Sequence, residues 1–130
     1  MLARRFKIRQ RSRIAFVLKK GRRIRSSLLQ FHYLTAPAAS SHFSVIVSKK
    51  ISKKAVTRNT IRRRVYGALQ EQWHMIGKTC YDVVVLVSPR IVTAPYQTIE
   101  KDIQFALKKL YGTASYGRMY TANTKPSPYG

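Results

Sequence analysis

Apolar residues recur every three or four positions in three stretches of the chain, which is the spacing of a helix that buries one face. These stretches predict helices over residues 12–20, 55–75 and 95–111. Gly21, Gly77 and Gly112 follow them, as is typical of helix ends. In the middle helix the buried stripe is expected to comprise Ile61, Val65, Ala68, Leu69 and Ile76.

Four shorter runs have the pattern of β-strands, at residues 22–26, 28–35, 42–48 and 81–87. The run at 81–87, YDVVVLV, is nearly all β-branched and is typical of a central strand covered on both faces, with Asp82 expected as a strand-edge residue. The order is therefore helix, three strands, helix, strand, helix, which indicates a single α+β domain.

The net charge of the chain indicates a polyanionic partner. The 130 residues contain 26 Lys and Arg against 4 Asp and Glu, a net charge of +22, and no acidic residue precedes Glu71. A hydrophobic content of 45% provides for a real core and argues against a disordered basic tail. Repulsion on this scale opposes compaction, and a nucleic acid is the polyanion that would relieve it.

The positive charge is densest at residues 47–64, VSKKISKKAVTRNTIRRR. Helical spacing places Asn59, Arg62, Arg63 and Tyr66 on one face, away from the apolar stripe. Arginine binds phosphate through a planar fork of donors, and asparagine can contact RNA backbone or base edges. A solvated basic face is the alternative interpretation of such a run. The candidate RNA-binding residues are Lys49, Lys50, Lys53, Lys54, Arg58, Asn59, Arg62 and Arg63.

An ordered motif in this segment resembles the signature of the protein subunit of bacterial ribonuclease P. The motif is Lys49-Lys50 followed by Ala55-Val56-x-Arg58-Asn59-x-Ile61-Arg62-Arg63. The resemblance extends more weakly over about residues 10–111. Thr60 stands where that family normally has Arg, and Tyr66 stands where Arg is common. Both departures remove positive charge from the expected RNA face.

The resemblance implies a fold, partners and a location. It implies a four-stranded sheet with a left-handed βαβ crossover through the basic helix, whereas physical rules alone predict a right-handed one. It implies an accessory subunit of an endoribonuclease, in which a catalytic RNA removes the 5′ leader of precursor tRNA with Mg²⁺ bound mainly by RNA. A bacterial cytoplasmic location is expected, with no membrane association and no obligate protein partner.

The resemblance also implies that the single-stranded leader lies in a cleft between the first helix and the sheet. Unpaired RNA is bound by basic grooves that contain stacking platforms. The aromatic candidates are Phe16, Phe31 and Tyr33, with an ordinary core position as the competing interpretation, above all for Phe31. Residues 1–11 are rich in Arg and Lys and are expected to form a basic arm, 12–112 the RNA-binding domain, and the polar residues 113–130 a flexible tail.

No catalytic or metal-binding constellation is evident in the sequence. The four acidic residues do not form a convincing metal site, the three histidines lack a nucleophile at a suitable spacing, and Cys80 is the only cysteine. We therefore expect no catalytic side chain and no protein-bound metal. Two rivals share the composition: a ribosomal or other structural RNA-binding protein, and a membrane-active or DNA-compacting basic protein. The ordered motif argues against the first, and the predicted core argues against the second.

Overall fold

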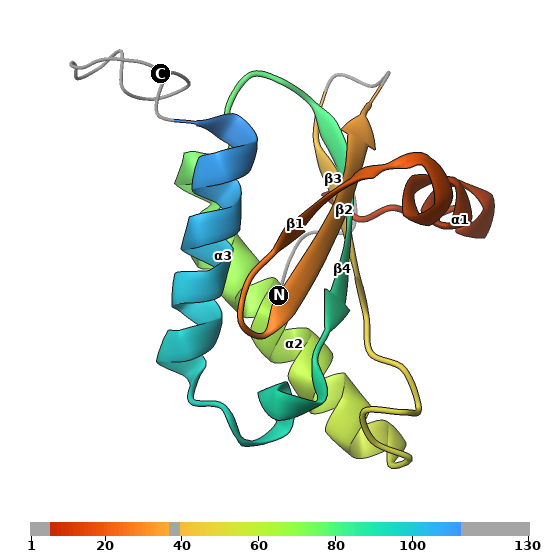
Figure 1. Ribbon diagram of the computed structural model, residues 1–130, viewed down its shortest axis with the longest axis vertical. Coiled ribbons are helices and arrows are strands. Elements are labelled where there is room, and N and C mark those ends of the chain that lie inside the picture. Colours follow the sequence, from red (N-terminus) through yellow and green to blue (C-terminus); the bar gives the residue numbers. More distant parts are fainter. Residues whose placement is uncertain (1–5, 37–39, 113–130) are drawn as a thin grey trace.

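The computed structural model describes residues 6–36 and 40–112, which form one sheet with helices on both of its faces (Figure 1). The expected tail at 113–130 and the first five residues of the expected arm lie outside the described residues. The elements are α1 (Arg11–Lys20), β1 (Arg22–Arg25), β2 (Leu29–Thr35), β3 (His42–Ile46), α2 (Ala55–Glu71), the 3₁₀ turn η2 (Trp73–Met75), β4 (Tyr81–Val87), the 3₁₀ turn η3 (Pro89–Thr93) and α3 (Tyr96–Tyr111).

The sheet has the strand order β1-β2-β4-β3. β1 pairs antiparallel with β2, and β2 pairs antiparallel with β4. β3 and β4 are parallel neighbours, and α2 connects them as the crossover. The predicted order and the α+β class are confirmed, and β4 is one of the two inner strands, as its β-branched composition indicated.

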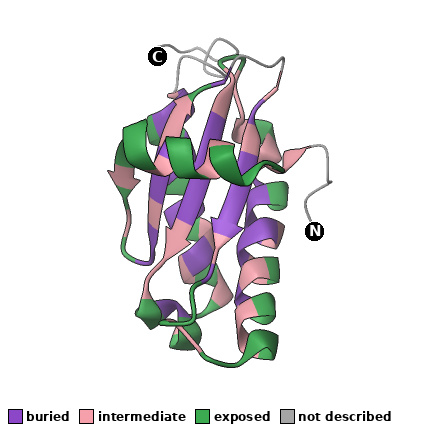
Figure 2. Ribbon diagram, turned by 90° about the vertical axis from the view of Figure 1, so that its right-hand side faces the viewer, coloured by how far each residue is buried: buried purple, intermediate pink, exposed green. Residues whose placement is uncertain are grey.

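The two faces of the sheet are covered unequally. α2 and α3 pack together over one face, where Phe31, Phe43, Val83 and Val85 are almost completely buried. α1 packs on the opposite face against β2 and β4 and has a single buried residue, Val17. Figure 2 shows α1 lying across one end of this face and leaving the other end uncovered. None of the helices in the described part of the chain has the length and hydropathy needed to cross a bilayer.

Strand β3 forms one edge of the sheet, and two other parts of the chain cover that edge. The backbone of Lys7 and Ile8 pairs with Phe43, so the second half of the expected N-terminal arm is packed against the domain. The buried hydroxyl of Tyr66 accepts a hydrogen bond from the amide of Val45 at 3.0 Å. The expectation that Tyr66 lies on the RNA face is therefore wrong: α2 turns this phenol inward to satisfy a strand amide that has no strand partner on that side.

Two buried carboxylates join distant segments. Asp82 accepts a hydrogen bond from Arg13 of α1 at 2.6 Å and lies 3.4 Å from His42, so it anchors α1 instead of lying exposed at a strand edge. Asp102 of α3 accepts hydrogen bonds from the hydroxyl of Ser27 and the amide of Leu28. Hydrogen bonds to ionised groups are roughly twice as strong as neutral ones, so these contacts fix α1 and the β1–β2 hairpin firmly.

Helix ends differ from the sequence prediction in two places. α2 stops at Glu71, and the chain continues as the turn η2, so Ile76 is not on the helical stripe. Gly21 ends α1 in an extended conformation instead of a left-handed one. A Cβ atom there would lie 2.4 Å from the carbonyl oxygen of Val17, so the glycine is required by close approach.

Tyr66→Phe is expected to lower the free energy of unfolding by about 1–3 kcal/mol, because the buried Val45 amide would lose its acceptor. Urea unfolding followed by circular dichroism measures the change. Tyr96→Phe is the matched control, because its hydroxyl donates to the exposed Glu71, and its effect is expected within about 0.5 kcal/mol. Equal losses of stability in the two variants would contradict the role of Tyr66 at the strand edge.

Candidate RNA interface

A lysine loop, residues 47–54, leads from the end of β3 to the start of α2. Its lysines Lys49, Lys50, Lys53 and Lys54 are all exposed. Ile51 packs against the core between the two pairs, and its amide bonds to the carbonyl of Ser48 at 3.0 Å. One apolar anchor therefore holds the loop close to the domain while four ammonium groups extend into solvent.

The outer face of α2 brings three predicted RNA-binding residues together. Asn59, Arg62 and Arg63 line a concave surface of about 370 Å³ with Val56, which is 76% exposed. Arg62 donates a hydrogen bond to the Asn59 side-chain oxygen at 2.7 Å, which restrains its guanidinium on the surface that Arg63 also lines. This surface offers fixed donors and a small apolar contact, as a nucleic-acid backbone requires.

Arg58 differs from the other predicted residues because it is tied to the lysine loop. Its Nη1 atom donates to the carbonyls of Ser52 and Lys53, both at 3.0 Å. The helix begins after Lys54 without a side-chain cap and without an acidic residue in its first turn. The positive end of the helix dipole therefore adds to the lysine charge instead of being neutralised within the chain.

The uncovered end of the sheet lies on the same face as α1. The strand register aligns Arg25, Gln30, Leu86 and Ile46 in one row across the four strands, defined here as the open row. Arg25 is exposed and the other three are half-buried. The row ends, at Ile46, where the lysine loop begins, so the basic loop and the open sheet face are continuous.

His32 lies in the next row toward α1 and is 7% exposed. Neither ring nitrogen has a hydrogen-bond partner among the described residues. Burial, and secondly the charge of Arg23 on the adjacent strand, hold the pKa of His32 below its ordinary value of 6.5. The fold therefore disfavours the protonated form of this imidazole.

Two of the three predicted leader-stacking residues are on the wrong face. Phe31 is 1% exposed in the core beneath α2 and α3. Tyr33 shares that face and packs edge-on against Tyr81, with ring centroids 5.4 Å apart. Only Phe16, 47% exposed on α1 with the Arg13 guanidinium 5.6 Å from its ring centre, remains available as a platform.

Both β1 and β2 were predicted as strands from the sequence, but no binding role was assigned to β1 or to the polar side of β2. Leu29, Phe31 and Tyr33 alternate with Gln30 and His32, so the more apolar set had to face the two long helices. Gln30 and His32 therefore lie on the opposite face, which α1 covers only in part. Phe31 and Tyr33 were predicted to stack on the leader because they are aromatic, and the difference in polarity between the two faces of β2 was not considered.

The acidic side chains contact protein groups and do not gather as a ligand set. Besides Asp82 and Asp102, Glu71 accepts a hydrogen bond from Tyr96 at 2.9 Å, and burial together with this bond raises the pKa of Tyr96 to about 12. Desolvation and then a hydrogen bond with Glu71 raise the pKa of Glu100. Over residues 6–36 and 40–112, no three His, Cys, Asp or Glu side chains come together as metal ligands.

The fold and this surface define a small basic α+β protein whose lysine loop, helix face and open sheet face are arranged to bind a polyanion. The family model Ribonuclease P matches residues 2–111, and the chain belongs to the ribonuclease P protein family. It is therefore a relative of the protein component of a ribonuclease.

Individual relatives agree with this assignment. The chain is 30% identical over 110 residues to the ribonuclease P protein component of Pseudanabaena, covering 84% of this chain and 94% of the relative. A Picosynechococcus relative is 34% identical over 73 residues, and the match spans 51% of this chain and 63% of the relative's length. The fold is similar to that of the ribonuclease P protein of Thermotoga maritima, with a TM-score of 0.71, 20% identity and coverage of 79% and 96% of the two chains.

Replacing both Arg62 and Arg63 with Ala is expected to weaken binding to a ribonuclease P RNA while leaving the fold intact, because alanine favours helix and neither side chain belongs to the core. Removing each charge-assisted hydrogen bond to phosphate should cost roughly 1.5–3 kcal/mol. Dissociation constants at two salt concentrations test this, and the salt dependence should become shallower. Lys101→Ala with Lys108→Ala removes the same charge from exposed positions on another helix, α3. If this control weakens binding as much, net charge and not the α2 face determines affinity.

His32 predicts a stability that depends on pH. Because its pKa is lowered in the fold, the unfolded chain binds more protons below about pH 6.5, so stability is full above this value and falls as pH decreases. Unfolding midpoints at pH 7.5 and 5.5 should therefore differ less in His32→Leu than in the unchanged protein. His74→Gln, which removes an exposed imidazole, should keep the original difference. An undiminished pH effect in His32→Leu would contradict the assignment.

Proposed function

We propose that this chain is the RNA-binding subunit of a ribonuclease P holoenzyme and supports removal of the 5′ leader from precursor tRNA. The observation that carries the proposal is the continuity of the basic surface. The lysine loop joins the Asn59–Arg63 face of α2 to the open row of the sheet, so two RNA segments can be held side by side. One surface faces the catalytic RNA, and the other takes an unpaired strand.

In this proposal the hydrolytic chemistry belongs to the RNA subunit. The carboxylates of this chain anchor α1, the hairpin and α3, and these structural roles leave them poorly placed to act on a phosphodiester. In the same proposal Mg²⁺ is bound mainly by the RNA partner. The lysine loop and α2 neutralise phosphates where the two RNAs converge. Lower repulsion between the strands then favours a compact holoenzyme.

The leader is assigned to the face shared by α1 and the open row. Phe16 supplies an exposed ring from α1, and Leu86 and Ile46 supply apolar contact from the sheet. This arrangement replaces Phe31 and Tyr33, which are committed to the opposite face. With this function we infer a cytoplasmic location.

Reconstitution tests the function directly. The protein, a bacterial ribonuclease P RNA and a precursor tRNA at low Mg²⁺ are expected to give accurate 5′ cleavage that either macromolecule alone does not give under the same conditions. The holoenzyme should also bind precursor tRNA more tightly than mature tRNA, because only the precursor has a leader. Equal affinity for the two substrates would refute leader binding.

Phe16→Leu separates stacking from general binding. It should weaken precursor binding by about 1–3 kcal/mol if a base stacks there, and should leave mature tRNA binding unchanged. Phe105→Leu is the matched control, since Phe105 is 44% exposed on α3, on the far side of the sheet. Weaker binding of both precursor and mature tRNA by Phe16→Leu would point to an effect on folding or on the RNA subunit.

A further inference from the structure

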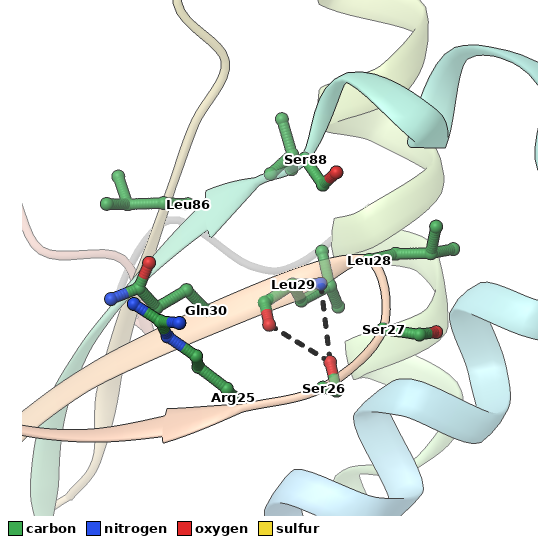
Figure 3. Close-up of a pocket in the computed structure, with 9 residues that line it drawn as sticks. Arg25, Ser26, Ser27, Leu28, Leu29, Gln30, Leu86 and Ser88 are labelled. Carbon is green, nitrogen blue, oxygen red and sulfur yellow. Dashed lines mark hydrogen bonds between the residues drawn. The ribbon is translucent and has the colours of Figure 1, made fainter.

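A pocket lies at the β1 end of the open row, around the tip of the β1–β2 hairpin. It has a volume of about 200 Å³ and is lined by residues 25–30 of the β1–β2 hairpin and residues 86–88 at the end of β4 (Figure 3). An apolar cavity of about 150 Å³ accommodates benzene, so this space suits one planar ring system and is too small for a folded element. Its position continues the sheet face on which the leader is proposed to lie.

The walls of this pocket are held rigidly by three separate contacts. Asp102 binds the hairpin from α3, as described above. The Arg90 guanidinium donates to the carbonyl of Ser27 at 2.5 Å, and the amide of Ser88 donates to the carbonyl of Leu28 at 2.8 Å. Restraint from three elements fixes the hairpin tip before any ligand arrives, and a preorganised site loses less entropy on binding.

Two polar side chains in the pocket have no partner within the described chain. Arg25 and Gln30 are register neighbours on β1 and β2, and Figure 3 shows their side chains lying next to each other on the same side of the hairpin. No hydrogen bond joins either side chain to another described residue. Leu86 is the next residue in the row and supplies an apolar surface beside them.

This set of groups matches the edge of a purine. Arginine donates to the O6 and N7 atoms of guanine, and glutamine pairs with the N6 and N7 groups of adenine. N7 is the acceptor that both purines share, and pyrimidines lack it. Unpaired RNA exposes this edge, because its bases are not held in a duplex.

We propose that the pocket binds one unpaired purine of the leader and that Arg25 and Gln30 recognise its N7 edge. This inference rests on the proposed function, because it needs a leader strand on the open face. It gives the chain a base-selective subsite beyond α1, in addition to the sequence-independent contacts of the lysine loop and α2.

Substitution of single atoms in the RNA tests the proposal. The reconstituted holoenzyme is given precursor tRNAs that carry one 7-deazapurine at each leader position in turn, in a leader made of purines. Removal of the N7 acceptor should weaken binding about 3- to 10-fold at one position and leave the other positions unchanged. If precursor binds more tightly than mature tRNA but no position responds, the purine subsite is refuted while leader binding stands.

Protein variants test whether Arg25 and Gln30 cause the response to 7-deazapurine. Gln30→Leu and Arg25→Met keep the size of the side chains and should abolish the 7-deaza response at the sensitive position. Gln104→Leu, an exposed glutamine on α3, should retain the response in full. A response that persists in both pocket variants would place purine recognition elsewhere and overturn the proposal. If precursor and mature tRNA bind equally in the unchanged holoenzyme, the proposed function itself fails.

Discussion

The alternation of side chains along β2 and β4 determines which surface of the sheet is open to a ligand. Phe31 pairs with Val85 on one face, and Gln30 pairs with Leu86 on the other. Because alternate residues point to opposite sides, the apolar set can be buried by α2 and α3 only if the mixed set faces away from them. The short helix α1 then covers part of that second face, and the open row is what it leaves. A shift of one residue in strand pairing would exchange the two faces and destroy both the core and the open row.

The scarcity of carboxylates imposes a second constraint. Four acidic groups cannot neutralise 26 cations, and two of the four, Asp82 and Asp102, are buried as anchors between distant segments. The lysine loop and the outer face of α2 therefore have no acidic neighbour in their own sequence. Their charge is therefore available to a partner.

Element types and their order could be predicted from the sequence because periodicity and strand composition are local properties. The position of the lysine loop and of the Asn59, Arg62 and Arg63 face followed from helical spacing and was also predictable. The orientation of Tyr66 could not be predicted in this way. Its side chain points inward because it accepts a hydrogen bond from the amide of Val45, which is remote in sequence. The leader candidates failed for a related reason: aromatic character marks both stacking platforms and core residues, and only the packing of α1 distinguishes the two.

The two sides of the proposed leader groove differ in how firmly they are held. α3 is anchored by residues such as Ile99, Ile103 and Leu107, all essentially buried, whereas α1 has only Val17. Each fully buried aliphatic side chain contributes roughly 1.5–3 kcal/mol, so apolar burial holds α1 several times more weakly, and its ion pair with Asp82 provides a larger share of its attachment. Weakly packed elements are those that move at low cost in free energy. The wall that carries Phe16 can therefore adjust to leaders of different sequence, while the hairpin at the far end, pinned by Asp102, keeps the fixed geometry that recognition of a base edge requires.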